Sequence, residues 1–177
     1  MTKRKVILFI ATSLDGYIAT KEEKLDWLFA VEGEGDNGFS NFYQTVDTVV
    51  MGRKTFDWIK NEMDEYPYQD KESYVFTRSK TLAHSHAQFT NEKVKTFLTT
   101  LKQQEGEAIW LVGGGDLLKT CLEEKLVDEI IVTVAPKMIG EGIALFQEGD
   151  YHVNLNLLGV QTFNQFVELH YKVEKEA

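Results

Sequence analysis

Apolar residues in this chain follow two patterns that alternate along the sequence, short continuous runs and sets with helical spacing. Continuous runs, which are typical of strands buried on both faces of a sheet, cover Lys5–Thr12, Asp47–Met51, Ser73–Thr77, Ile109–Val112 and Asp128–Ala135. Helical spacing predicts helices over Asn37–Val46, from Gly52 to about Lys60, over Asn91–Gln104 and around Leu117–Leu122. The chain therefore alternates strands with helices.

The last part of the chain has a different pattern. Asn154–Val173 alternates apolar and polar residues well enough to predict two antiparallel strands, and Gln88–Thr90 predicts one more short strand. The resulting order, β-α-β-α-β-β-α-β-α-β-β-β, predicts an α/β fold with a mostly parallel sheet, flanking helices and an antiparallel C-terminal edge. With 177 residues, 43% of them hydrophobic, we expect residues 1–177 to form one domain with a small-molecule cleft.

Groups suited to phosphate follow three of the predicted strands. They are the glycines Gly113, Gly114 and Gly115, then Gly52 with Arg53 and Lys54, and finally Arg78 with Ser79 and Lys80. Glycines allow close backbone approach, helix N-termini offer free N–H groups, and arginine forks onto phosphate. Because ligands of such sheets bind outside the carboxyl ends of the strands, a dinucleotide with a third phosphate fits this set. The alternative is a tight glycine turn without a ligand, beside solvated surface charges.

Charge and cysteine content narrow the possible partners and compartment. The formal net charge of −9 disfavours nucleic acid and anionic membrane surfaces as partners, and we expect no metal site. The single cysteine, Cys121, lies on the apolar face of a predicted helix and is interpreted as a core residue. The sequence contains neither a recognisable leader peptide nor an apolar run long enough to span a bilayer. We expect a cytoplasmic protein that acts on a small molecule, with a homodimer as the candidate assembly.

Five segments in order, IATSLDGYIA, VVMGRKTF, VFTRS, IWLVGGGDLL and EIIVTVAP, carry a resemblance over almost the whole chain. The series resembles the dihydrofolate reductase fold family, most closely the branch related to the reductase domain of riboflavin biosynthesis. This resemblance implies a three-layer fold and NADPH as cofactor, with a cis peptide bond between two of the three glycines. It places Ala11 and Ile18 beside the nicotinamide, Thr77 and Arg78 at the 2′-phosphate, and Gly52–Thr55 at the pyrophosphate and nearby phosphates. It places the following residues at the pyrophosphate and on the nicotinamide side: Gly113, Gly114, Gly115, Asp116, Leu117 and Leu118.

The resemblance also implies a catalytic acid. Counting back from Gly52 places Asp36 where folate reductases carry a carboxylate, and Thr133 falls where they have a threonine that hydrogen-bonds it. A carboxyl group in an apolar pocket has a raised pKa, which suits it to protonation chemistry. Asp36 is equally suited to be a helix N-cap alone. Glu34 and, in the SLDG turn, Asp15 are the other candidate acids.

We expect the substrate to lie between the long loop Lys21–Asp36 and the helix that follows it. Trp27, Phe39 and Phe42 are then candidates to stack on a flat heterocycle, although aromatic residues at such positions also form ordinary core.

Two departures from the related enzymes keep the substrate open. Lys71 stands where folate reductases have an arginine, and Tyr17 stands where riboflavin reductases usually have a lysine. The leading hypothesis is an NADPH-dependent reductase of a small heterocycle or ribosylamino-pyrimidine, as in riboflavin biosynthesis. Reduction of dihydrofolate and non-catalytic binding of NADP(H) are the alternatives.

Overall fold

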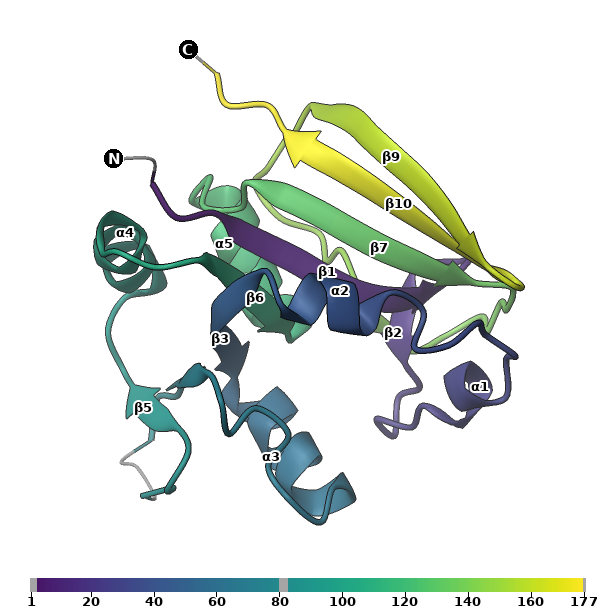
Figure 1. Ribbon diagram of the computed structural model, residues 1–177, viewed down its shortest axis with the longest axis horizontal. Coiled ribbons are helices and arrows are strands. Elements are labelled where there is room, and N and C mark those ends of the chain that lie inside the picture. Colours follow the sequence, from purple (N-terminus) through teal and green to yellow (C-terminus); the bar gives the residue numbers. More distant parts are fainter. Residues whose placement is uncertain (1–2, 80–82, 177) are drawn as a thin grey trace.

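The computed structural model describes residues 3–79 and 83–176, which fold around one eight-stranded sheet (Figure 1). The strand order is β5-β4-β3-β6-β1-β7-β10-β9. The strands are β1 Val6–Ser13, β3 Val46–Gly52, β4 Glu72–Phe76, β5 Gln88–Thr90, β6 Ala108–Gly113, β7 Glu129–Ala135, β9 Leu155–Phe163 and β10 Phe166–Val173. The first six strands of this order run parallel, and β10 pairs antiparallel with both β7 and β9. The predicted α/β fold with an antiparallel C-terminal edge is confirmed.

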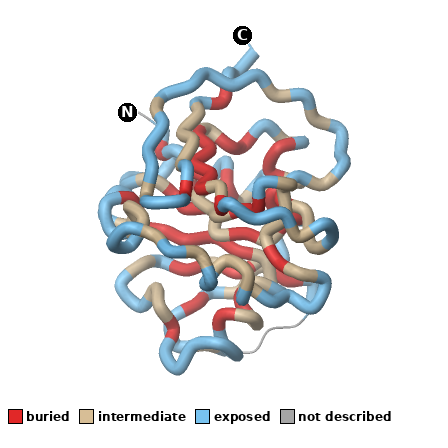
Figure 2. The backbone as a smooth tube through the Cα atoms, turned by 90° about the vertical axis from the view of Figure 1, so that its right-hand side faces the viewer, coloured by how far each residue is buried: buried red, intermediate tan, exposed pale blue. Residues whose placement is uncertain are grey.

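Helices cover both faces of the sheet and make the fold three-layered. The helices are α1 Asp26–Phe29, α2 Phe39–Tyr43, α3 Arg53–Glu62, α4 Val94–Gln103 and α5 Gly115–Glu123. One core joins α4 and α5 to one face of the sheet, and a second core joins α2 and α3 to the other. Successive residues of β1 alternate between the two cores, as the pleat of a buried strand requires. Figure 2 shows the buried residues concentrated in the central sheet, with exposed loops around it.

Two predicted segments differ from the structure. The helix expected over Asn37–Val46 is only the five residues of α2, because Asn37 and Gly38 have positive φ angles of 54° and 78° and a helix cannot include them. The long loop expected over Lys21–Asp36 contains the single-turn helix α1. After the SLDG turn, β2 (Tyr17–Ala19) pairs with β8 (Ile143–Ala144) in a separate two-stranded sheet.

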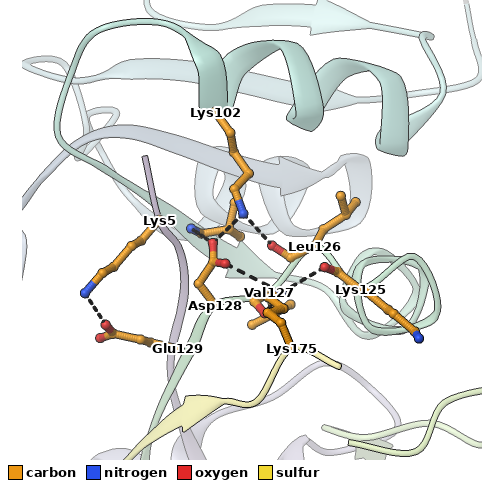
Figure 3. Close-up of polar contacts among 9 residues, drawn as sticks. Lys5, Lys102, Lys125, Leu126, Val127, Asp128, Glu129 and Lys175 are labelled. Atoms are coloured by element: carbon orange, nitrogen blue, oxygen red, sulfur yellow. Dashed lines mark hydrogen bonds and ion pairs between the residues drawn. The ribbon is translucent and has the colours of Figure 1, made fainter. Parts of the chain in front are cut away.

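The amino ends of the central strands are held by a cluster of charges (Figure 3). Asp128, directly before β7, accepts hydrogen bonds from the Val6 amide at 2.8 Å and from Lys102 Nζ at 2.6 Å, and Lys175 Nζ lies 3.5 Å away. One carboxylate thus connects β1, α4 and the C-terminal segment.

Two further observations concern the core and the helices. Cys121 is fully buried, as expected for a core residue, and burial raises the pKa of its thiol to about 12. Among the described helices, none has the length and apolar character needed to cross a membrane.

Candidate active site

The two glycine junctions lie side by side at the carboxyl ends of β3 and β6. Met51 of β3 is in register with Gly113 of β6, so the turns leading into α3 and α5 are neighbours. Gly52 and Gly114 are the N-cap residues of these helices, and within the described part of the chain neither cap makes a side-chain hydrogen bond. The free N–H groups of two helix N-termini therefore converge on one place, which suits an anion.

The glycines at this place bring the two turns and Thr55 close together. A Cβ on Gly114 would lie 3.3 Å from the Thr55 hydroxyl oxygen, and a Cβ on Gly52 would lie 3.7 Å from the Gly114 nitrogen. The Gly113–Gly114 peptide bond is cis, as the resemblance implies. A Cβ on Gly115, by contrast, would meet Gln147 Nε2 at 2.6 Å, so this glycine serves the packing of the loop behind α5. Gly52, Gly114 and Thr55 thus lie close together at the carboxyl ends of β3 and β6.

The other predicted residues of these junctions differ in what they can offer. Arg53 donates to Asp57 at 2.9 Å and its guanidinium lies over the Phe89 ring, so it is held toward β5. Lys54 and Asp116 are exposed. Leu117 and Leu118 are buried in the core, and the Leu118 amide already donates to the Gly114 carbonyl. The side chains of these two leucines face the core, so their predicted place at the cofactor concerns their backbone.

The third predicted junction lies next to the first. Gly52 of β3 is in register with Phe76 of β4, so the Thr77–Arg78–Ser79 turn follows beside the α3 N-terminus. The Thr77 hydroxyl is 3.1 Å from the Ser79 hydroxyl and accepts the Ser79 amide at 3.3 Å. The turn leaves the Arg78 side chain exposed. Lys80 lies outside the described residues.

The residues predicted to border the nicotinamide lie near the end of β1 and in β2. Ala11 and Ile18 are both half-buried, Ala11 in β1 and Ile18 in β2. Ala11 is in register with Thr133 of β7, which is in register with Glu168 of β10. Phe9 and Ile131, two residues before Ala11 and Thr133, belong to the α2-side core, so the three side chains share that face.

Asp36 does not have the environment that its predicted catalytic role requires. It is exposed, and its carboxylate accepts bonds from the Gly38 amide at 3.1 Å and from the Ser40 amide and hydroxyl. The bonds from Ser40, and then the one from Gly38, lower the pKa of Asp36. The expected raised pKa is therefore wrong. The N-cap residue of α2 is Gly38, and Asp36, two residues earlier, accepts the Ser40 amide of the first helical turn with its side chain. Glu34, the alternative acid, is exposed as well.

Asp15 is a structural residue of the SLDG turn. Its carboxylate accepts bonds from the Ser13 hydroxyl at 2.6 Å and from the Gly140 amide at 2.8 Å. The bond from Ser13 is the main reason that the pKa of Asp15 is lowered, so this side chain is an anion near neutral pH.

Thr133 lies beside a different carboxylate from the one expected. It is in register with Glu168 on the neighbouring strand β10, whereas the side-chain bonds of Asp36 go to its own loop and helix. Burial raises the pKa of Glu168, and the charge of His170 and the Thr133 hydroxyl offset this only in part. Sequence reasoning missed Glu168. The available signal was the alternation in β10, which places Glu168 and His170 on the same face as buried Phe166.

The aromatic residues expected to contact the substrate differ in how deeply they are buried. Phe39 is half-buried and stacks on Tyr43 with centroids 5.2 Å apart, whereas Phe42 is buried and stacks on Phe9 at 4.1 Å. Tyr68 and Trp110 complete the cluster and were not predicted. Trp27, in α1, is half-buried, and its indole nitrogen has no hydrogen-bond partner among the described residues.

Comparison with known proteins agrees with this fold. YwjB, an uncharacterized protein of Bacillus subtilis (strain 168), is 47% identical over 170 residues, which cover 96% of this chain and 98% of YwjB. A crystal structure of a putative riboflavin biosynthesis protein from Shewanella sp. PV-4 is 30% identical, has a TM-score of 0.87 and covers 97% of this chain and 99% of its own.

A more distant structure supports the fold alone. Dihydrofolate reductase from Enterococcus faecalis, solved with NADP(H), is 17% identical with a TM-score of 0.69 and covers 97% of both chains. The fold is therefore dihydrofolate reductase-like. The family model for the RibD C-terminal domain matches residues 4–169, and the chain belongs to this family.

Proposed function

We propose that this protein is an NADPH-dependent reductase of a flat nitrogen heterocycle, of the ribosylamino-pyrimidine kind implied by its family. The observation that carries the proposal is the meeting of two helix N-termini at Gly52 and Gly114, with the Thr55 hydroxyl between them. Such a cradle suits the diphosphate of a dinucleotide, because its free N–H groups supply both hydrogen bonds and positive dipole ends.

The residues around the cradle are suited to the rest of the cofactor. Arg78, with the Thr77 and Ser79 hydroxyls beside it, suits the adenosine 2′-phosphate, since guanidinium pairs with phosphate through two hydrogen bonds. Ala11 has a small side chain at the end of β1, which leaves space for the nicotinamide. The bound cofactor supplies the hydride, and the protein orients the two reactants.

The substrate side of the site is aromatic. Phe39, Tyr43 and Tyr68 form a wall that suits a flat ring, and Trp110 lies beneath them with its Nε1 donating to the Phe9 carbonyl at 3.0 Å. Dihydrofolate is less favoured as substrate. Lys71 already lies over the Tyr43 ring at 4.3 Å and near Asp70 at 3.6 Å, with its side chain only 13% exposed, so it is not turned outward to meet a glutamate tail.

A thermal-shift titration with NADPH and NADH tests the cofactor. Binding to the native state raises the melting temperature, and we expect NADPH to act at lower concentration than NADH. Arg78→Glu should remove most of this preference for NADPH, because a carboxylate would repel the 2′-phosphate that the guanidinium attracts. Lys172→Glu, on the exposed side of β10, changes the net charge equally and serves as the control. Equal affinities for NADPH and NADH in the parent protein would contradict the proposal.

Turnover separates a reductase from a protein that only binds NADP(H). Loss of the reduced nicotinamide absorbance is followed with ribosylamino-pyrimidines and dihydrofolate as substrates. NADPH binding without oxidation by any of them would favour the non-catalytic alternative.

A further inference from the structure

A cavity of about 440 Å³ lies between α2 and the β10–β9 edge of the sheet. Its floor is apolar and consists of Ile7 and Phe9 of β1 and Ile131 of β7, with Phe42 of α2 forming one side. The volume is in the range of small-molecule sites, and the apolar floor with the Phe9 and Phe42 rings suits a flat ring. Each end of the cavity carries one carboxylate, Glu129 at one end and Glu168 at the other.

The two carboxylates have different partners. Glu129 is held by Lys5 at 2.6 Å, as Figure 3 shows, and by His170 at 2.8 Å, so its charge is already matched. Glu168 interacts with the Thr133 hydroxyl, and its burial raises its pKa. Gln161 of β9 is in register with Glu168, and Asn41 and Thr45 are the other uncharged polar residues of the lining. Glu168 is therefore the carboxylate that still has acceptor capacity for a ligand.

The register of the sheet connects Glu168 with the nicotinamide side. Ala11, Thr133 and Glu168 occupy one row across β1, β7 and β10 and share the α2-side face. Neighbouring strands are about 4.8 Å apart, so the Cα atoms of Ala11 and Glu168 are separated by about 10 Å. A two-ring or one-ring heterocycle over this row can touch both ends of it.

We propose that the cavity takes the amino-bearing edge of a flat heterocycle and that Glu168 accepts its N–H hydrogen bonds. This inference rests on the proposed function for the identity of the ligand as a substrate. Glu168 would recognise an amidine-like edge of the ligand. On such an edge, two N–H groups, in the ring or exocyclic, face one carboxylate. In this assignment the carboxylate of the site comes from β10 and Asp36 is confined to capping α2.

Benzamidine, a flat ring with an amidinium group, is the probe for this site, and benzamide is its neutral counterpart. Binding is measured by calorimetry near neutral pH without NADPH. We expect benzamidine to bind the parent protein, and Glu168→Gln to weaken it by about tenfold or more, because a charge-assisted bond pair is lost. Benzamide should bind weakly and equally to both. Glu168→Gln keeps the side-chain shape, so its melting temperature and its NADPH titration should match the parent.

Glu129→Gln is the matched variant at the other end of the cavity. Since Lys5 and His170 already neutralise Glu129, this variant should change benzamidine affinity less than Glu168→Gln does. Unchanged benzamidine affinity in Glu168→Gln, or a larger loss in Glu129→Gln, would overturn the assignment. Glu168-dependent benzamidine binding in a protein that fails to bind NADPH would leave this site standing and refute the proposed function instead.

Discussion

Gly114 and Gly115 are neighbours in the chain but have different surroundings, and this gives a prediction at the scale of single residues. Gly114 has a φ of −92°, which alanine adopts, and its added Cβ would face only the Thr55 hydroxyl. We expect Gly114→Ala to keep the free energy of unfolding within about 1 kcal/mol and to weaken NADPH binding by about tenfold or more, because the methyl group enters the phosphate cradle.

Gly115→Ala is the comparison variant. Its methyl group would overlap the Gln147 amide at 2.6 Å and lie 3.2 Å from the Ala144 carbonyl, so we expect a loss of stability of about 1–3 kcal/mol from overpacking. Chemical denaturation and NADPH titration measure both effects. If Gly114→Ala binds NADPH as the parent does, the glycine triplet is a turn and no cofactor cradle.

Asp36 gives a prediction about pH. Its pKa is lowered from 3.8 in the folded protein, so the ionised carboxylate stabilises the fold above that value and loses this contribution as the pH falls through the lower folded pKa. We therefore expect Asp36→Asn to be less stable than the parent near neutral pH. The difference should shrink in acid below pH 3.8. Denaturation curves over a pH series provide the measurement, and a difference that stays constant into acid would contradict capping by the charged form.

At the scale of elements, the charge cluster in Figure 3 predicts the behaviour of one aspartate. Asp128 joins the start of β1, the end of α4 and the C-terminal segment through the Val6 amide, Lys102 and Lys175. Asp128→Asn keeps the shape but weakens two charge-assisted contacts, so we expect a loss of about 1–3 kcal/mol in the free energy of unfolding. Glu176→Gln breaks the exposed Lys125–Glu176 pair and should cause no measurable change. Equal effects of the two variants would show that Asp128 does not stabilise the contact between these three segments.

Strands of the sheet could be predicted from the sequence almost residue by residue. The run Asp47–Met51 corresponds to β3 (Val46–Gly52), and Asp128–Ala135 to β7 (Glu129–Ala135). Strands buried on both faces are almost entirely apolar, so their ends are easy to recognise in the sequence. Helix α2 was predicted to be twice as long as it is. Its apolar spacing continues through Val46, but backbone conformation at Asn37 and Gly38 and the start of β3 decide its ends.

The phosphate side of the candidate site was accessible to sequence reasoning, whereas the substrate side was not. Gly52, Thr55 and Gly114 are brought together by neighbouring parallel strands, which motif order alone implies. The pairing of Thr133 with Glu168 depends on the register of β10 against β7, and 34 residues separate them in the chain. The register between strands so far apart in the chain cannot be obtained from local patterns. The sequence therefore predicts Asp36 as the carboxylate beside Thr133.

At the scale of the whole molecule, the two ends of the sheet have different tasks. Ionic contacts such as that of Asp128 hold the amino ends of β1 and β7. The carboxyl ends of β3, β4 and β6 carry glycine and hydroxyl groups with free hydrogen-bonding capacity instead. The stabilising ionic contacts and the proposed ligand site are therefore at opposite ends of the strands, so variants at Asp128 and at Gly114 can be interpreted independently.

The β9 edge of the molecule bears on the expected homodimer. β9 is the last strand in the sheet order, and its nine residues, LNLLGVQTF, include no charged residue. Its register with β10 places Leu157 and Val160 on one face with Tyr171 and Leu169, next to Val167. Five apolar side chains of this hairpin are 39–57% exposed: Leu155, Leu157, Leu158, Val160 and Val167. Soluble proteins normally protect such an edge with charges.

A second copy of the chain is the occupant that fits this surface best. Each copy carries a net charge of −9, so two copies repel each other over most of their surface. The β9 edge, which has no charged residue, is where this repulsion is least, and an isologous contact brings the same apolar residues from both sides. We therefore predict a homodimer that buries Leu157 and Val160, and light scattering after size exclusion should give twice the mass of one chain.

Lysine substitution tests the position of this contact. Val160→Lys should shift the monomer–dimer equilibrium toward monomer by about tenfold or more, because dimerisation would have to bury an unpaired ammonium group. The folded monomer should tolerate the change, since Val160 is 53% exposed on an edge strand. Gln103 is an exposed residue of α4, which follows β5 at the opposite end of the sheet order from β9. Gln103→Lys adds the same charge and should leave the dimer intact. A parent protein that stays monomeric at all concentrations, or a Val160→Lys variant that dimerises as well as Gln103→Lys, would refute the β9 contact.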